Sequence, residues 1–458
     1  MTIVENESEL LDPITRPSRT ISGWTALRLL SRRVHFLAGM AIAPLLAVLC
    51  LSGIAYAFSP QINDLVYGDT LSVGAPGGSA RPVAEQVAAA QRARPGAALE
   101  SVIVSDSPDA TTRVVFPAGG HEHHGGGFNA ESTTVYVNPY TTEIAGQETT
   151  VSGRPPVQVW LREFHGNLKL GEPGRLYAEF VASWLPVVVI GGLVLWLGKR
   201  RGKRLTPDAR GETGRARTRG WHGAIGLWIS VGLLAVSVTG LTWSVHAGER
   251  VDDLVAALDA RSPSLSAPAV VAPAGATPID LDRVITVARE GGLSGTLTVT
   301  PPAARTKPFK VTESSAGLPV QKDSVAVDPY TGAITGRVGW DDYPLLAKLT
   351  TLGIQGHSGE LFGLANQIVM ALIAAGALVL LVLGYRMWWK RRPAAGGLPA
   401  SPHVAWSRVP RPVIAGIVVA TAALAWAMPV LGVTLAVFLL IDFAVATARG
   451  RRSGMIEV

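Results

Sequence analysis

Histidines are the residues whose type and placement suggest chemistry in this chain. Five of its nine histidines stand within a few residues of the ends of long apolar runs: His35, His165, His222, His246 and His357. A neutral imidazole offers iron a nitrogen ligand without burying an anion, so two histidines from facing helices could hold one haem between them. A single histidine at a membrane interface can instead be an amphipathic anchor or a helix cap, and that alternative stays open for each one.

The sequence around four of these histidines recurs along the chain. Arg33-Val-His-Phe-Leu-Ala-Gly39 and Gly220-Trp-His-Gly-Ala-Ile-Gly226 each open an apolar run. Phe164-His-Gly-Asn-Leu and Gly356-His-Ser-Gly-Glu-Leu-Phe-Gly363 each precede another. The histidines of the first two segments therefore match each other, and so do those of the last two, which indicates an internal two-fold repeat.

The recurrence predicts two haem sites. We expect His35 and His222 to bind one haem b at an inner site, and His165 and His357 to bind a second at an outer site. His246 has no counterpart in the first half of the chain. It could replace an outer ligand or touch substrate. Glycines in the first and third runs would let a flat macrocycle approach the helix backbones, although ordinary helix packing uses glycine equally well.

A separate histidine-rich tract, Gly119-Gly-His-Glu-His-His-Gly-Gly-Gly127, lies between two predicted strands. Its histidines, His121, His123 and His124, could capture a divalent metal, or the glycines could leave the tract a solvated loop. A metal permease that uses this tract as a receiver would need polar groups along the middle of a span, and the apolar runs hold almost none.

Composition indicates a membrane protein. The 458-residue chain is 48% hydrophobic and only 16% charged, against about 25% charged in a soluble domain. Its net charge of +7 comes from Lys and Arg clustered beside the apolar runs, where they set membrane orientation, so nucleic acid is not an expected partner. The single cysteine, Cys50, excludes an internal disulfide, covalent haem attachment through a Cys-x-x-Cys-His motif, and a thiolate cluster.

Apolar runs long enough to cross about 30 Å of hydrocarbon predict six spans with both termini in the cytoplasm. A tight turn at Met428–Pro429 would separate the last two. In chain order we expect a cytoplasmic segment (1–31), a first span (32–58), an extracytoplasmic domain (59–165), a second span (172–198), a basic cytoplasmic loop (199–220), a third span (221–246), a second extracytoplasmic domain (247–356), a fourth span (357–388), a second basic loop (389–411), a span hairpin (412–448) and a cytoplasmic tail (449–458).

The two extracytoplasmic segments are predicted to be small α+β domains of the same design. Helical patterns at Val83–Ala93 and Leu281–Glu290 are each followed by short alternating strands. Each segment then ends in a strand, an Asn/Asp-Pro-Tyr-Thr turn and a further strand, at Val135–Ile144 and Val325–Ile334. The fold class is therefore a helical polytopic membrane protein with two inserted α+β domains.

These motifs resemble the PepSY-associated transmembrane family, which includes bacterial iron-regulated membrane proteins and ferric-siderophore reductases. Val327-Asp-Pro-Tyr-Thr-Gly332, Trp221-His222 and His357-Ser-Gly-Glu-Leu-Phe-Gly363 carry the resemblance, which extends over about Arg28 to Arg392. It implies a four-helix core, two outer PepSY domains, a place in the bacterial cytoplasmic membrane and, in the reductase branch, b-type haem held by histidine pairs.

The expected function is transmembrane electron transfer by these haems, with reduction of an extracytoplasmic ferric chelate such as a siderophore, so that iron is released for uptake. Such a protein would be a haem-dependent ferric-chelate reductase. No flavin or nicotinamide motif is present, so a quinol or a cytoplasmic reductase would be the electron donor. The alternative is a PepSY-based ligand-binding or sensory membrane protein without redox activity.

Overall fold

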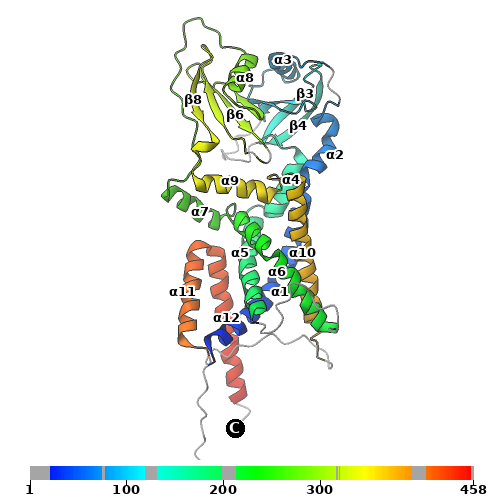
Figure 1. Cartoon of the computed structure of the whole chain (residues 1–458), viewed down its shortest axis with the longest axis vertical. Helices are drawn as coiled ribbons and strands as arrows, with labels where there is room; N and C mark the ends of the chain where they lie inside the picture. Colours follow the sequence, from blue (N-terminus) through cyan, green and yellow to red (C-terminus); the bar gives the residue numbers. More distant parts are fainter. Residues whose placement is uncertain are drawn as a thin grey trace, which may run out of the picture.

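A bundle of four long apolar helices forms the lower part of the molecule (Figure 1). They are α1 (Gly23–Ala57), α5 (Glu172–Leu197), α6 (Gly214–Leu241) and α10 (Leu364–Trp389), and each is long and apolar enough to cross a membrane. The computed structural model describes residues 21–74, 78–118, 131–198, 213–315, 318, 320–393 and 409–454. Both α1 and α6 pack against α5 and α10, and apolar side chains of all four helices fill the space between them.

Four shorter helices lie near the junction of this bundle and the sheet, with α2 beside the strand β4 (Figure 1). They are α2 (Ser59–Leu71), α4 (Pro156–Asn167), α7 (His246–Ala257) and α9 (Leu345–Ser358). Compared with the expected spans 221–246 and 357–388, α6 stops earlier, at Leu241, and α10 begins later, at Leu364. A turn separates α9 from α10: Gly359 and Gly363 adopt φ values of 84° and 54°, which end α9 and change the direction of the chain before α10.

The segment between α1 and α5 and the segment between α6 and α10 share one antiparallel sheet of eight strands in the order β4-β3-β2-β1-β5-β6-β7-β8. The first segment contributes β1 (Ser101–Val104), β2 (Thr112–Pro117), β3 (Glu131–Val137) and β4 (Ile144–Val151). The second contributes β5 (Thr296–Thr300), β6 (Phe309–Ser314), β7 (Ser324–Val327) and β8 (Ile334–Val338). The central strands β1 and β5 pair with Val102 opposite Val299, so the two α+β units are joined edge to edge.

Each unit keeps its own helix, hydrophobic core and turn. Helix α3 (Val83–Ala93) and helix α8 (Leu281–Glu290) have the predicted bounds, and each packs on its own strands. The Asn138 and Asp328 side chains accept hydrogen bonds from the backbone N–H two residues later, at 2.9 and 2.7 Å, which forms the predicted turns. These short-range predictions are confirmed because the signals for them lie within a few residues of one another.

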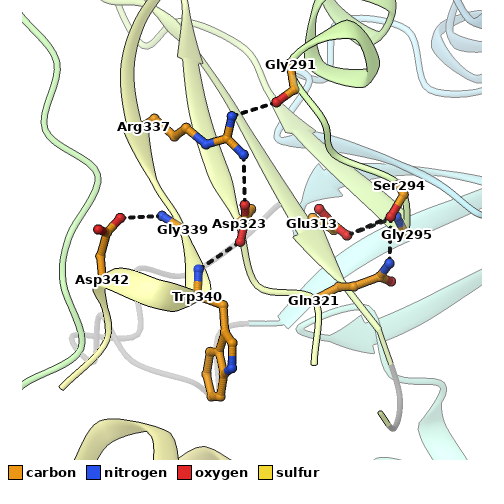
Figure 2. Close-up of polar contacts among 10 residues, drawn as sticks. All are labelled: Gly291, Ser294, Gly295, Glu313, Gln321, Asp323, Arg337, Gly339, Trp340 and Asp342. Carbon is orange, nitrogen blue, oxygen red and sulfur yellow. Dashed lines mark hydrogen bonds and ion pairs between the residues drawn. The ribbon is translucent and has the colours of Figure 1, made fainter. Parts of the chain in front are cut away.

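A polar network fixes the chain where it leaves the sheet for α9. Figure 2 shows Arg337 of β8 donating to the Asp323 carboxylate at 3.1 Å and to the Gly291 carbonyl at 2.7 Å. The other oxygen of Asp323 accepts from the Trp340 N–H at 2.8 Å, in the 3-10 turn η1 (Trp340–Asp342). The position of α9 is thereby tied to the sheet.

The C-terminal region forms a helical hairpin beside the bundle (Figure 1). Its helices α11 (Arg411–Ala427) and α12 (Pro429–Gly454) are separated by Met428, as the sequence predicts, because proline cannot continue the preceding helix. The indole N–H of Trp184 on α5 donates to the Thr434 hydroxyl on α12 at 2.8 Å, and the Trp184 ring packs edge-on against Phe438. The hairpin is thus held against α5.

Candidate functional site: paired histidines at two depths

The first histidine pair lies near the basic end of the bundle, away from the sheet. His35 on α1 and His222 on α6 have ring centroids 6.0 Å apart and ring planes at 83°. Nδ1 of His35 contacts the Val188 carbonyl of α5 at 2.7 Å, and since a carbonyl only accepts, Nδ1 carries the proton. The lone pair of His35 is therefore on Nε2, the nitrogen available to a metal.

His222 differs from His35 in the surroundings of its Nδ1. Its Nδ1 is buried without a well-formed hydrogen bond, although the Leu380 carbonyl of α10 lies nearby. This nitrogen therefore has no hydrogen-bond partner among the described residues.

The second pair lies at the other end of the bundle, beneath the sheet. His165 on α4 and His357 on α9 have ring centroids 6.3 Å apart and ring planes at 51°. These helices are separate from the spans, so the outer histidines reach the bundle from short helices that lie beside it. His357 precedes the fourth long helix, as the motif in the sequence indicates, and the turn at Gly359 separates it from α10.

Hydroxyl groups fix both outer rings. Ser52 Oγ lies 3.0 Å from Nδ1 of His165, and Thr239 Oγ1 lies 2.8 Å from Nδ1 of His357. Ser52 donates its own proton to the Leu49 carbonyl, and Thr239 donates to the Ala235 carbonyl. Each hydroxyl therefore accepts from the histidine Nδ1–H, which leaves Nε2 of both rings with a free lone pair.

Burial disfavours the charged form of both histidines of this second pair. Burial lowers the pKa of His165 below its usual value. Burial, together with the proximity of His165, lowers the pKa of His357 to about 4. Neutral imidazole is the form that binds a metal, so protonation does not compete with metal binding in this pair near pH 7.

Each of the four rings lies against a glycine of a neighbouring helix. The contacts are His35 with Gly192, His165 with Gly53, His222 with Gly384 and His357 with Gly240. A Cβ at Gly53 or Gly192 would stand 3.1 Å from the ring Cε1, closer than a methyl group normally approaches. Gly53 and Gly240, expected to face a macrocycle, thus make room for the histidine rings.

A cavity of about 470 Å³ opens beside the first pair, within the range of roughly 300–1,000 Å³ typical of ligand pockets. His35 and His222 both line it, together with apolar side chains, several glycines and four arginines. Apolar walls with two convergent imidazoles suit a flat, largely apolar metal macrocycle.

The ring spacing agrees with one iron held between two histidines. An iron–nitrogen bond of about 2 Å and about 1.2 Å from that nitrogen to the ring centre give a centroid separation of roughly 6.4 Å. The two pairs measure 6.0 and 6.3 Å. Both spacings are close to that value, and the second pair lies about 25 Å from the first, judged by the 1.5 Å rise per residue along α1 from His35 to Ser52.

The structure places His246 apart from these pairs. His246 begins α7, where its backbone N–H donates to the buried Glu179 carboxylate at 3.1 Å, and its ring has no aromatic contact with His165 or His357. His121, His123 and His124 fall outside the residues that the structure describes. Among the described residues, no cluster of three or more His, Cys, Asp or Glu side chains could hold a metal ion.

Three contacts of the paired histidines were not predicted from the sequence. Ser52 and Thr239 hold the outer rings, and Trp243 packs edge-on against His357 with centroids 5.8 Å apart. The sequence does contain a pattern that could have pointed to the two hydroxyl residues. Leu51-Ser-Gly53 and Val238-Thr-Gly240 stand at the same distance after His35 and His222 in the first and third apolar runs. A hydroxyl inside a span is common, however, and only the approach of α4 and α9 gives these two a partner.

A search of curated proteins returned no match to this chain. The family model described as the PepSY-associated TM region matches residues 32–391, which include both histidine pairs, the whole sheet and all of the four bundle helices except the first nine residues of α1. The chain is a membrane protein that belongs to the PepSY-associated TM region family.

Proposed function

We propose that this protein is a bacterial inner-membrane electron-transfer protein that binds two b-type haems and reduces a ferric chelate, such as a siderophore, on the outer face. The observation that carries the proposal is the presence of two histidine pairs, at ring spacings of 6.0 and 6.3 Å, near opposite ends of one apolar bundle. Haem bound at both pairs would supply one-electron carriers at two depths of the membrane.

Residues around the histidine pairs orient the rings for binding haem iron. Hydrogen bonds to Nδ1 hold three of the rings with Nε2 free: Val188 for His35, Ser52 for His165 and Thr239 for His357. Such contacts to the distal nitrogen fix the tautomer and raise the basicity of the ligand. Apolar side chains around the first pair keep water away, and burial can tune a reduction potential.

The orientation follows from charge. Arginines gather at the end of the bundle near His35 and His222, and the positive-inside rule assigns this end to the cytoplasm. The sheet then lies outside, both chain termini lie inside, and an electron donor, either a quinol or a cytoplasmic reductase, would act at the His35 end. Corresponding contacts in the two halves, Ser52 with His165 and Thr239 with His357, support an internal two-fold repeat.

The shared sheet would receive the chelate near the outer pair. Helices α4 and α9 carry the outer histidines and connect directly to β4 and η1, so the sheet and the outer pair are adjacent in the chain. Reduction of the iron weakens its binding to hard oxygen ligands and would release it.

A visible spectrum of the purified full-length protein tests the proposal. We expect a sharp Soret band, α and β bands that appear on reduction, and about two haems per chain. A correctly inserted protein that takes up no haem would favour the alternative, in which the sheet binds a ligand for a sensory role and the histidines are structural.

A further inference from the structure

Four arginines line the cavity beside His35 and His222: Arg32 on α1, Arg215 and Arg219 on α6, and Arg391 just after α10. They come from three elements that are far apart in the sequence. Within the part of the chain that the structure describes, none of the four forms an ion pair with a carboxylate. The cavity therefore has a strongly cationic rim and no internal counter-charge.

Two of these arginines stand at the same sequence spacing from the two histidines. Arg32 precedes His35 by three positions and Arg219 precedes His222 by three positions. Residues three apart share a helix face, with a rise of about 4.5 Å between them. Each arginine therefore stands about one turn from its histidine, toward the basic end of the bundle and on the side that lines the same cavity.

Membrane orientation alone would not bring these charges together. The positive-inside rule is satisfied by any basic residue near the bundle end, including Arg217, which lies on α6 between two cavity arginines but does not line the cavity. Burial, with Arg215 and Arg32 nearby, lowers the pKa of Arg391, so these cations repel one another. Like charges gathered around an apolar cavity indicate an anionic ligand.

We propose, on the basis of the function proposed above, that this arginine rim binds the two propionate carboxylates of the haem held between His35 and His222. The apolar walls and imidazoles suit the macrocycle and its iron, while the carboxylates need cationic partners that are also hydrogen-bond donors. The guanidinium fork pairs with a carboxylate through two parallel hydrogen bonds, and all four rim cations are arginine. The site thus selects a porphyrin with two carboxylates and directs that edge to the basic end of the bundle.

The test uses the full-length protein in nanodiscs, with His165→Ala and His357→Ala present so that only the inner pair binds haem. The haem-depleted protein is titrated with iron protoporphyrin IX and with its dimethyl ester, which lacks both carboxylate charges. The readout is the ratio of the two affinities, followed by the Soret band, and it needs no turnover. The parent should prefer the free acid by roughly tenfold or more.

Arg32→Gln with Arg219→Gln should reduce that ratio to near one by weakening binding of the free acid while leaving binding of the ester unchanged. Arg217→Gln is the matched control and should keep the parental ratio. The single variants Arg32→Gln and Arg219→Gln, each expected to reduce the ratio severalfold, give the answer if the double variant does not fold.

The outcomes separate this inference from the proposed function. Bis-histidine spectra with an unchanged ratio in the Arg32 and Arg219 variants would overturn the propionate assignment and leave haem binding intact. A ratio that falls equally in Arg217→Gln would also overturn it, because general surface charge would then explain the preference. A wild-type protein that binds neither porphyrin would overturn both proposals.

Discussion

The Thr239 hydroxyl accepts a hydrogen bond from Nδ1 of His357 over 2.8 Å, which fixes that ring with Nε2 free. Thr239→Val keeps the shape of the side chain but leaves a buried N–H unpaired, a change worth about 1–3 kcal/mol. We expect the outer haem to be retained less tightly and its midpoint potential to change by on the order of tens of millivolts. Potentiometric titration of the visible bands checks this.

Thr242→Val is the matched control for that experiment. Thr242 donates to the Thr239 carbonyl at 2.7 Å and has no hydrogen bond to a histidine. An unchanged potential in Thr239→Val, or an equal change in Thr242→Val, would show that the contact with His357 does not tune the site.

Removal of one inner ligand should affect one site only. His222→Ala is expected to remove roughly half of the haem absorbance, because the outer pair lies near the other end of the bundle. Haem is measured by pyridine haemochrome assay against protein concentration. Deletion of residues 121–124 should leave the haem content unchanged. Full haem content in His222→Ala would refute the inner assignment.

The glycine contacts predict a selective steric effect. A side chain at Gly192 would collide with His35, since even a Cβ would lie 3.1 Å from the ring Cε1. In Gly192→Val we therefore expect the haem at His35 and His222 to be lost, which removes roughly half of the haem absorbance, while the haem at His165 and His357 remains. Gly416→Val on α11 is the control, because its Cβ would meet no atom within 4 Å. Full haem in Gly192→Val would mean that the ring moves aside at little cost.

The direction of electron flow can be tested with His357→Ala in oriented vesicles. Reductant is supplied on the basic side and a membrane-impermeant ferric siderophore on the sheet side. We expect the haem at the inner pair to remain reducible while reduction of the external chelate falls to background, since the inner pair lies about 25 Å from the outer one. Undiminished chelate reduction, with correct insertion confirmed, would place His357 off the route.

Topology is open to direct measurement. Fusion reporters at about residues 110, 210, 300 and 400 should report outside, inside, outside and inside, as the basic loops require. A C-terminal reporter should report inside. An outside signal near residue 210 would invert the proposed orientation, and with it the assignment of His35 and His222 to the cytoplasmic side.

The sequence by itself determined the local features of this protein. Apolar runs predicted α1, α5, α6 and α10. In both α+β units, helical periodicity predicted the short helix, and alternating apolar and polar residues with Asn/Asp-Pro turns predicted the strands. Recurring motifs also predicted which histidines lie together, and the structure has His35 beside His222 and His165 beside His357.

Only the tertiary structure decided the rest. The turn at Gly359 moves His357 onto α9, the pairing of β1 with β5 joins two units in one sheet, and the rim arginines converge from three elements. The hydrogen bonds of Ser52 and Thr239 likewise depend on how α4 and α9 approach the bundle. Helix and strand periodicity acts over a few neighbouring residues, whereas these contacts join residues far apart in the chain, and side-chain packing between whole elements sets their distances.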